Sequence, residues 1–182
     1  MSSINLNSTL NDITKWGTML VVLQLYTGGS LNDTAWRQST AFILLGLAVY
    51  NMIVSGIFNI QNLGDYKSLV EDWLKFGTML TVSRLLSGQP LDQDWVRTTL
   101  YILLGFTTYD VLVSKVITGD RLTSTPVMQS VINDLAKFGT MLVVSQLLST
   151  GNLMDPVWRT TAVGTLLGFV IYDLLVKGVF NQ

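Results

Sequence analysis

The chain has 182 residues, of which 49% are hydrophobic and 13% charged, about half of the roughly 25% charged residues of an ordinary soluble domain. Its formal net charge of −1 gives no electrostatic argument for a nucleic-acid partner. The absence of His and Cys excludes Ser-His and Cys-His catalysis, haem and iron–sulfur ligation, the usual zinc sites and disulfides. We therefore expect no catalytic, cofactor-binding or metal-binding residues and no enzymatic activity.

The amino-terminal segment, MSSINLNSTLND, is polar and has no basic region followed by an apolar run. This pattern differs from that of a cleavable secretory signal. If the chain enters a membrane, we expect its internal segments to direct it there.

One sequence unit occurs three times along the chain. KWGTMLVV begins at Lys15, KFGTMLTV at Lys75 and KFGTMLVV at Lys137, so the copies are 60 and 62 residues apart. Later in each copy there is a Trp, and the glycine of LLGLAVYN, LLGFTTYD or LLGFVIYD follows it after ten residues. Such a period predicts repetition of one supersecondary unit. We therefore divide the chain into repeats at 1–59, 60–118 and 119–182.

Each repeat begins with a predicted first helix. Ser68 and Glu71 have the spacing of a capping box, and Pro126 after Thr125 is a favoured first helical residue. The turn residues TGGS, SGQP and STGN predict that these helices end near Tyr26, Leu86 and Leu148.

The second helix of each repeat has a predicted acidic N-cap three residues before the Trp. An Asp at this place accepts backbone N–H bonds and complements the helix dipole. From the Trp to Phe58, Ile117 or Phe180 the helix has 23 residues, about 34 Å of α-helix, which matches a hydrocarbon core of roughly 30 Å. We expect these three helices to span a membrane. The predicted caps are Asp33, Asp92 and Asp155.

The first helices favour a membrane span less strongly. Only twelve residues separate Lys15 from Gly28, and an apolar stretch of that length is more typical of a core helix or an interfacial segment. If only the three second helices crossed the membrane, successive copies would have opposite orientations. Copies with similar sequences favour the same orientation. We therefore predict an all-α fold of three tandem helical hairpins, a pseudo-threefold repeat with six transmembrane or membrane-embedded helices. A soluble helical bundle remains the alternative.

The basic residues predict an orientation if each copy is a hairpin that crosses twice. Seven would lie on the side of the termini and three on the side of the hairpin turns, with Arg84 inside a helix. The positive-inside rule then places both termini on the cytoplasmic or inner side. The seven are Lys15, Lys67, Lys75, Lys115, Arg121, Lys137 and Lys177, and the three are Arg37, Arg97 and Arg159.

Two sets of polar residues interrupt the apolar helices. A charged side chain at a membrane centre costs about 2.5–3.5 kcal/mol on insertion scales, so such residues usually face a partner or water. We expect intramembrane polar contacts between helices, with Arg84 paired to Asp110 or Asp173 and Asp173 also facing Lys177. The alternative is a polar pathway in which the two aspartates relay protons or bind a cation. The sets are Gln24, Arg84 and Gln146, and Asn51, Asp110 and Asp173.

Two sets of glycines also recur at fixed places in the copies. Small residues let membrane helices approach closely, so we expect them to pack the two helices of each hairpin together. The sets are Gly17, Gly77 and Gly139, and Gly46, Gly105 and Gly168.

The unit KFGTML…LL…W…LLGFxxYD, over 15–58, 71–117 and 137–180, resembles small repeat-containing membrane proteins of large icosahedral DNA viruses of algae and protists. The resemblance implies a structural role in the virion inner membrane or in the minor-capsid layer at the capsid–membrane interface. It implies no functional residue.

The leading hypothesis is a non-enzymatic virion component that anchors or joins shell components through its hairpins. Its partners would be the lipid bilayer and other virion or membrane proteins, with homo-oligomerisation left open. The turns at Gly28–Ser30, Gln89–Pro90 and Gly151–Asn152 would make the partner contacts. The alternatives are a small three-repeat transporter or channel with a polar path at Arg84, Asp110 and Asp173, and a soluble helical scaffold.

Overall fold

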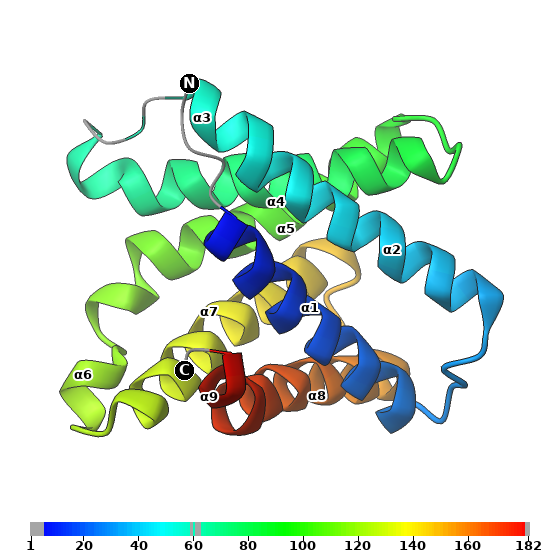
Figure 1. The fold of residues 1–182 in the computed structure, drawn as a ribbon. Helices are drawn as coiled ribbons and strands as arrows, with labels where there is room; N and C mark the ends of the chain where they lie inside the picture. Colours follow the sequence, from blue (N-terminus) through cyan, green and yellow to red (C-terminus); the bar gives the residue numbers. More distant parts are fainter. Residues whose placement is uncertain (1–5, 59, 61–62, 181–182) are drawn as a thin grey trace.

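The computed structural model describes residues 6–58, 60 and 63–180 (Figure 1). These residues form helices and connecting segments, and no strand occurs among them. The prediction of an all-α fold is confirmed.

Each repeat contributes two long helices joined by a short turn. The first helices are α1 (Leu6–Tyr26), α4 (Lys67–Leu86) and α7 (Pro126–Ser149). Their second-helix partners are α2 (Thr34–Val49), α5 (Gln93–Val111) and α8 (Pro156–Ile171). The predicted ends of the first helices therefore lie within one residue of the observed ends.

The second helices differ at their carboxyl ends. A π-helical turn at Tyr50–Val54 leads from α2 into α3 (Ser55–Ile57), and one at Tyr172–Val176 leads from α8 into α9 (Lys177–Phe180). In contrast, α5 ends at Val111 rather than Ile117. It is followed by 3₁₀ turn Val113–Lys115 and α6 (Gly119–Leu122). A further 3₁₀ turn, Gly64–Tyr66, precedes α4.

The predicted caps of the second helices are confirmed. Asp33 accepts hydrogen bonds from the backbone N–H groups of Ala35 and Trp36, Asp92 from Trp95, and Asp155 from Val157. These bonds satisfy donors that a helix start leaves without an intrahelical partner.

The two predicted first-helix starts have different outcomes. Pro126 begins α7, as predicted. The capping box at Ser68 and Glu71 is wrong, because α4 begins at Lys67 and Ser68 therefore lies inside the helix. Its hydroxyl donates to the carboxylate of Asp110 instead.

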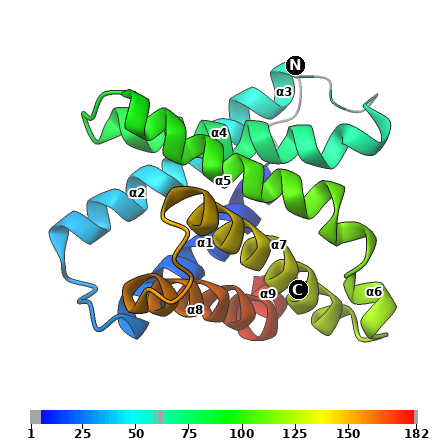
Figure 2. The ribbon, with the colours of Figure 1, turned by 180° about the vertical axis from the view of Figure 1, so that it is seen from behind.

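The most extensive helix packing joins different repeats rather than the two helices of one hairpin. The second helix of each repeat lies against the first helix of the next, in the pairs α2–α4, α5–α7 and α8–α1. Figures 1 and 2 show these pairs from opposite sides. Because α8 of the last repeat packs on α1 of the first, the arrangement closes on itself.

Three glycines lie at the crossing points of these pairs. A Cβ at Gly46 would lie 2.7 Å from the Met79 carbonyl oxygen, one at Gly105 2.7 Å from the Met141 Cα, and one at Gly168 2.6 Å from the Met19 Cα. The prediction of close approach at these glycines holds, but the helices that approach belong to successive repeats. The prediction that Gly46, Gly105 and Gly168 pack the helices of one hairpin is therefore corrected.

The other glycine set has open space around it. A Cβ at Gly77 or Gly139 would meet no atom within 4 Å, and one at Gly17 would meet only the Leu44 Cδ1 at 4.0 Å. The prediction that Gly17, Gly77 and Gly139 pack helices closely is wrong, because these glycines do not face a crossing.

An aromatic core lies where the first helices meet. The rings of Trp16, Phe76 and Phe138 have centroids 5.6, 5.7 and 6.3 Å apart. Phe106 stacks on Phe76 at 4.1 Å and Phe169 stacks on Phe138 at 3.9 Å, while Leu47 is fully buried at the matching position of the first repeat. We call these six side chains the aromatic core.

Four helical stretches of the described chain are long and apolar enough to cross a membrane. They are Thr34–Ile57, Gln93–Leu122, Pro126–Ser149 and Pro156–Val179. Large apolar side chains such as Ile53, Leu112 and Leu175 are exposed on them. Length and composition therefore support the prediction of membrane-spanning helices, for the three second helices and for α7.

Candidate functional site

Three aspartates precede the three repeated lysines by three residues. The pairs along the chain are Asp12 and Lys15, Asp72 and Lys75, and Asp134 and Lys137. Residues three apart lie on the same face of a helix. None of these aspartates was predicted as a site residue, although their recurrence at one place in every copy was the available signal.

Each lysine pairs with the aspartate of the preceding copy and not with the one on its own helix. The Lys75 Nζ lies 2.6 Å from Asp12, the Lys137 Nζ lies 2.6 Å from Asp72, and the Lys15 Nζ lies 2.5 Å from Asp134. We call these six residues the ion-pair ring. It links α1, α4 and α7 in the same cyclic order as the helix packing.

The ion-pair ring lies directly on the aromatic core. The Lys15 Nζ is 5.6 Å from the ring centroids of Phe138 and Phe169. The Lys137 Nζ is 5.9 and 5.8 Å from those of Phe76 and Phe106. Cations at such distances are attracted to aromatic faces, so the two layers stabilise each other.

Burial raises the carboxyl pKa of Asp72, one of the buried aspartates of the ion-pair ring. The Asp72 side chain on α4 is only 7% exposed. Its burial raises the pKa of this carboxyl from the ordinary 3.8 to about 6; Lys137 opposes the increase in pKa, while the negative charge of Asp110 adds to it. Protonation near pH 6 therefore changes the Asp72–Lys137 pair.

The predicted polar residues of the second helices surround the ring. The Asn51 Nδ2 donates to Asp12 over 2.6 Å. Asp110 accepts a hydrogen bond from the Ser68 hydroxyl at 2.8 Å. In the third repeat, Asp173 accepts one from the Ser130 hydroxyl, also at 2.8 Å, and this is the counterpart of the Ser68–Asp110 contact.

Lys177 is a further member of this surrounding layer. The predicted contact between Lys177 and Asp173 has a distance of 3.9 Å. The Lys177 Nζ also donates to the Ser130 hydroxyl oxygen at 2.9 Å.

The set formed by Gln24, Arg84 and Gln146 lies at the other end of the hairpins. Each side chain donates to a backbone carbonyl six residues later, in the turn: Gln24 to Ser30, Arg84 to Pro90 and Gln146 to Asn152, at 3.0, 3.0 and 2.8 Å. The prediction that these residues join helices inside the apolar region is wrong. Their long side chains instead reach forward over their own turns.

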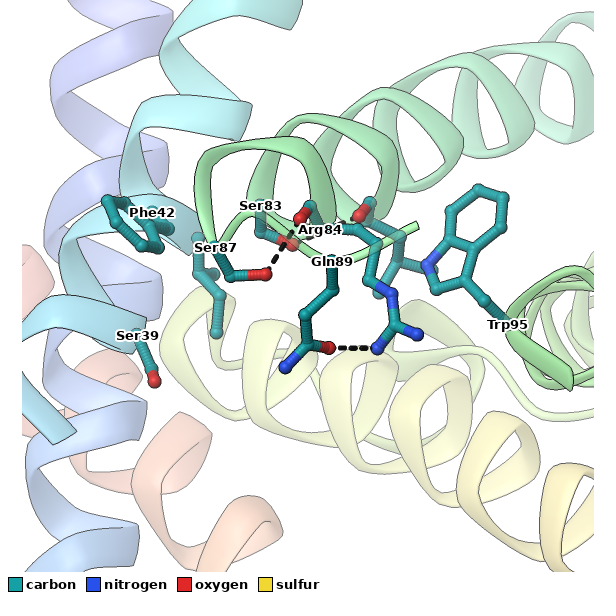
Figure 3. Close-up of a pocket in the computed structure, with 9 residues that line it drawn as sticks. Ser39, Phe42, Ser83, Arg84, Ser87, Gln89 and Trp95 are labelled. Atoms are coloured by element: carbon teal, nitrogen blue, oxygen red, sulfur yellow. Dashed lines mark hydrogen bonds between the residues drawn. The ribbon is translucent and has the colours of Figure 1, made fainter. Parts of the chain in front are cut away.

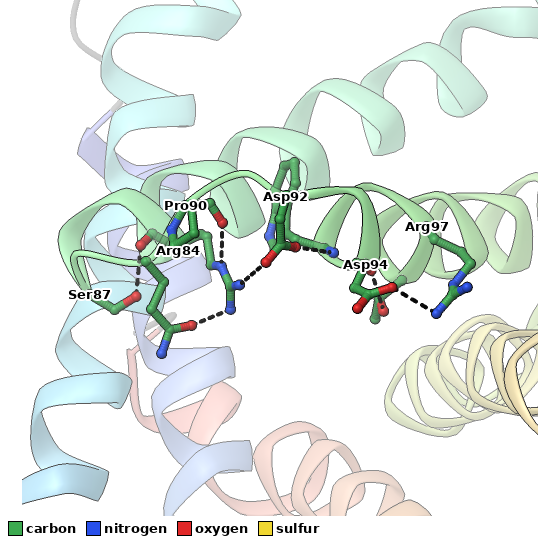
Figure 4. A network of polar contacts seen from close by, with 9 residues as sticks. Arg84, Ser87, Pro90, Asp92, Asp94 and Arg97 are labelled. Atoms are coloured by element: carbon green, nitrogen blue, oxygen red, sulfur yellow. Dashed lines mark hydrogen bonds and ion pairs between the residues drawn. The ribbon is translucent and has the colours of Figure 1, made fainter.

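Arg84 contacts neither Asp110 nor Asp173, contrary to prediction. It bonds to Gln89 (Figure 3). It also pairs with the Asp92 carboxylate (Figure 4), and the two groups are 3.4 Å apart. Asp92 is at the start of α5, whereas Asp110 is one residue from its end. The helix length therefore separates Arg84 from its predicted partner.

A shallow pocket of about 260 Å³ adjoins Arg84 between the turn ends of α2 and α4 (Figure 3). Phe42, Ser83 and Trp95 line it together with Arg84 and Gln89. Because Arg84 is already occupied by its contacts within the turn, this pocket offers no unpaired charge for a ligand.

The structure changes the count of basic residues behind the predicted orientation at one residue. Arg84 lies at a turn, so four basic residues are on the side of the turns against seven on the side of the termini. Lys15, Lys75 and Lys137 among the seven are paired with aspartates, but the positive-inside rule counts basic residues and acidic residues contribute little to it. The cytoplasmic or inner side of the termini therefore stays a prediction.

Comparisons with protein-family models, with curated proteins and with solved structures find no match to this chain.

Proposed function

We propose that this chain is a non-enzymatic structural membrane protein that anchors or joins neighbouring components of a virion, in its inner membrane or at the capsid–membrane interface. The observation that carries the structural role is cyclic closure. Each repeat is held to the next by a helix crossing at a glycine and by an ion pair, and the last is held to the first in the same way.

The placement of polar residues along the second helices supports a membrane location. From the capping aspartate to the polar residue beside the ion-pair ring there are 18 residues in every copy, as from Asp33 to Asn51. That length corresponds to about 27 Å of helix, close to a hydrocarbon core of roughly 30 Å. The turns and the ion-pair ring would then lie near opposite headgroup regions.

Exposed turns are the surfaces that we propose for partner contacts. Gly28, Pro90 and Asn152 are exposed at the three turns, beyond the ends of the apolar stretches. A membrane protein held rigid by its ring would present these turns at fixed separations. Fixed spacing is what a component that joins shell proteins needs.

The transporter alternative has weaker support. The predicted path ran through Arg84, Asp110 and Asp173, and Arg84 lies at the end of the helices opposite to the two aspartates. The closely packed aromatic core also occupies the space beside the ring where the first helices meet. We therefore keep the structural role as the proposal.

Three measurements test this proposal. After alkaline carbonate extraction, we expect the full chain to stay in the membrane fraction; recovery in the soluble fraction would overturn the membrane location. Mass spectrometry of purified virus particles should detect the chain in many copies, and its absence would overturn the virion role alone. Ion flux into liposomes that hold the chain would favour the transporter.

A further inference from the structure

The ends of the three second helices differ at two corresponding positions, five and nine residues after the crossing glycine. The first repeat has two uncharged residues there, Asn51 and Ser55. The third repeat has an acid and a base, Asp173 and Lys177. The second repeat has the acid without the base, because Asp110 is followed by Ser114.

The third repeat shows how an ammonium group is held at this place. Asp173 is buried, and it accepts a hydrogen bond from Ser130. The Lys177 Nζ lies 2.9 Å from the Ser130 hydroxyl oxygen and 3.9 Å from the Asp173 carboxylate. A primary ammonium thus occupies the space beside the serine and the carboxylate.

The second repeat has the same serine and carboxylate but no lysine at the position that corresponds to Lys177. Ser68 donates to Asp110 at 2.8 Å, as Ser130 does to Asp173. Within the described part of the chain, Asp110 forms no ion pair, and its buried Oδ2 has no hydrogen-bond partner. The Asp173 Oδ2 also has no hydrogen-bond partner, and Asp110 is partly buried. The two repeats therefore differ in the lysine that pairs with Asp173, and a cation beside Asp110 would supply the same attraction.

Space for a ligand is present beside this carboxylate. A pocket of about 460 Å³, the Asp110 pocket, is lined by Asp110, Ser68, Ser114 and Tyr109 among others. The corresponding pocket of the third repeat, which Lys177 itself lines, measures about 290 Å³. The second repeat therefore has a larger pocket where the third repeat carries its own lysine.

We infer that the Asp110 pocket binds a ligand with a primary ammonium group, whose nitrogen lies beside Asp110 and Ser68 as the Lys177 Nζ lies beside Asp173 and Ser130. Lys115 also lines this pocket and makes no ion pair in the described structure. It would suit an anionic group on the same ligand.

Two sources supply such an ammonium group, the ethanolamine headgroup of a phospholipid and a soluble amine. Val111, which lines the pocket, and Leu112 beside it are exposed and would contact acyl chains. The lipid source rests on the proposed membrane location, whereas ammonium binding itself does not. Binding of ethanolamine and selective retention of phosphatidylethanolamine separate the two sources.

The first experiment measures thermal unfolding of the full chain, purified in an amine-free nonionic detergent, as ethanolamine is added. We expect the melting temperature to increase with ethanolamine, because a ligand that binds only the folded state stabilises it. Asp110→Asn should weaken binding on the order of tenfold or more, the usual size of a lost charged hydrogen bond. Asn51 stands at the corresponding position of the first repeat, so an amide fits this fold.

The control variant is Asp94→Asn, which removes an exposed carboxylate far from the pocket. It should respond to ethanolamine as the unaltered chain does. No response of the unaltered chain, or an equal response of Asp110→Asn, would overturn the proposal.

The second experiment supplies the ammonium from the chain itself. Ser114→Lys should increase the melting temperature by about 2–4 °C without ligand, the shift expected for roughly 1 kcal/mol in a chain of this size, and should abolish the ethanolamine response. Ser55→Lys is the matched control. Ser55 and Ser114 both donate to the carbonyl four residues earlier, but Ser55 follows Asn51 and not a carboxylate.

Ser55→Lys should therefore leave the melting temperature and the ethanolamine response unchanged. An unchanged ethanolamine response in Ser114→Lys would contradict the proposed site, since a tethered ammonium would then fail to compete.

The third experiment identifies the source. Native mass spectrometry of the chain, reconstituted with equal amounts of phosphatidylethanolamine and phosphatidylcholine, counts the lipids that remain bound. Selective retention of phosphatidylethanolamine, lost in Ser114→Lys, supports the lipid headgroup. An ethanolamine response without selective retention supports a soluble amine, and failure of both measurements overturns ammonium binding whatever the outcome of carbonate extraction.

Discussion

The ion-pair ring and the hairpin turns use similar residues for different structural tasks. In the ring, a lysine of one repeat pairs with an aspartate of the preceding repeat, at 2.5–2.6 Å and largely buried. In the second turn, Arg84 pairs with Asp92 across only eight residues of chain, at 3.4 Å and partly exposed. Contacts between distant segments fix how the repeats are arranged, whereas contacts within a turn fix only the turn.

The largest effect is expected where the ring is broken. Asp72→Ala leaves Lys137 without its partner in a mostly buried place, and removal of one member of a buried pair typically destabilises by about 3 kcal/mol or more. Equilibrium unfolding of the purified chain in detergent measures this loss. Asp94→Ala, which breaks an exposed pair with Arg97, is the control and should cost less than about 1 kcal/mol.

An equal loss in Asp72→Ala and Asp94→Ala would show that the ring is no more important to stability than a surface pair. The distinction between the two regions would then fail.

The next largest effect is expected at the glycine crossings, which join the same successive repeats as the ion-pair ring. In Gly105→Ala the added Cβ would lie 2.7 Å from the Met141 Cα, so α5 and α7 must move apart, at a cost of about 1–3 kcal/mol. Gly139→Ala adds the same atom into open space and should stabilise its helix by up to about 1 kcal/mol. Opposite signs in thermal unfolding would distinguish the two glycine sets; a loss in both would contradict the packing described.

The glycines also show which parts of this fold are readable from sequence. Asp33 marks a helix start because a cap depends on residues near in sequence, and the recurrence of Gly46 marks a place where some helix approaches closely. Which helix approaches Gly46 depends on how hairpins associate, and the repeat pattern is the same whether Met79 or a residue of the same hairpin lies opposite. Sequence alone therefore could not choose between packing within a hairpin and packing between repeats.

The same limit explains the missed ion-pair ring. Lys15 followed a polar segment and preceded an apolar one, which is also the pattern of a lysine at a membrane boundary. Only the cyclic arrangement brings it to Asp134, 119 residues away. The assignment of Arg84 to the apolar interior was wrong because of the length of its side chain. The side chain leaves the helix and reaches the carbonyl of Pro90 in the turn.

A smaller effect is expected from pH. The raised pKa of Asp72, about 6 against an ordinary 3.8, means that the folded chain binds a proton more readily than the unfolded chain between these values. The contribution of this group to stability should therefore increase as pH falls from 7 to 5, by about 1 kcal/mol, and decrease again as pH returns to 7. Unfolding at both pH values measures it, and Asp72→Asn should remove this component.

The smallest effect is expected at the turn. Arg84→Gln replaces the arginine with the residue that the first and third repeats already carry at this place, where Gln24 and Gln146 donate to the corresponding carbonyl. The bond to Pro90 should be kept, while the exposed contact with Gln89 and the partly exposed pair with Asp92 are lost, at a cost of about 0.5 kcal/mol. Arg84→Ala removes all three contacts and should cost about 1 kcal/mol. If Arg84→Gln were as destabilising as Asp72→Ala, Arg84 would hold helices together after all, and the turn would belong with the ring.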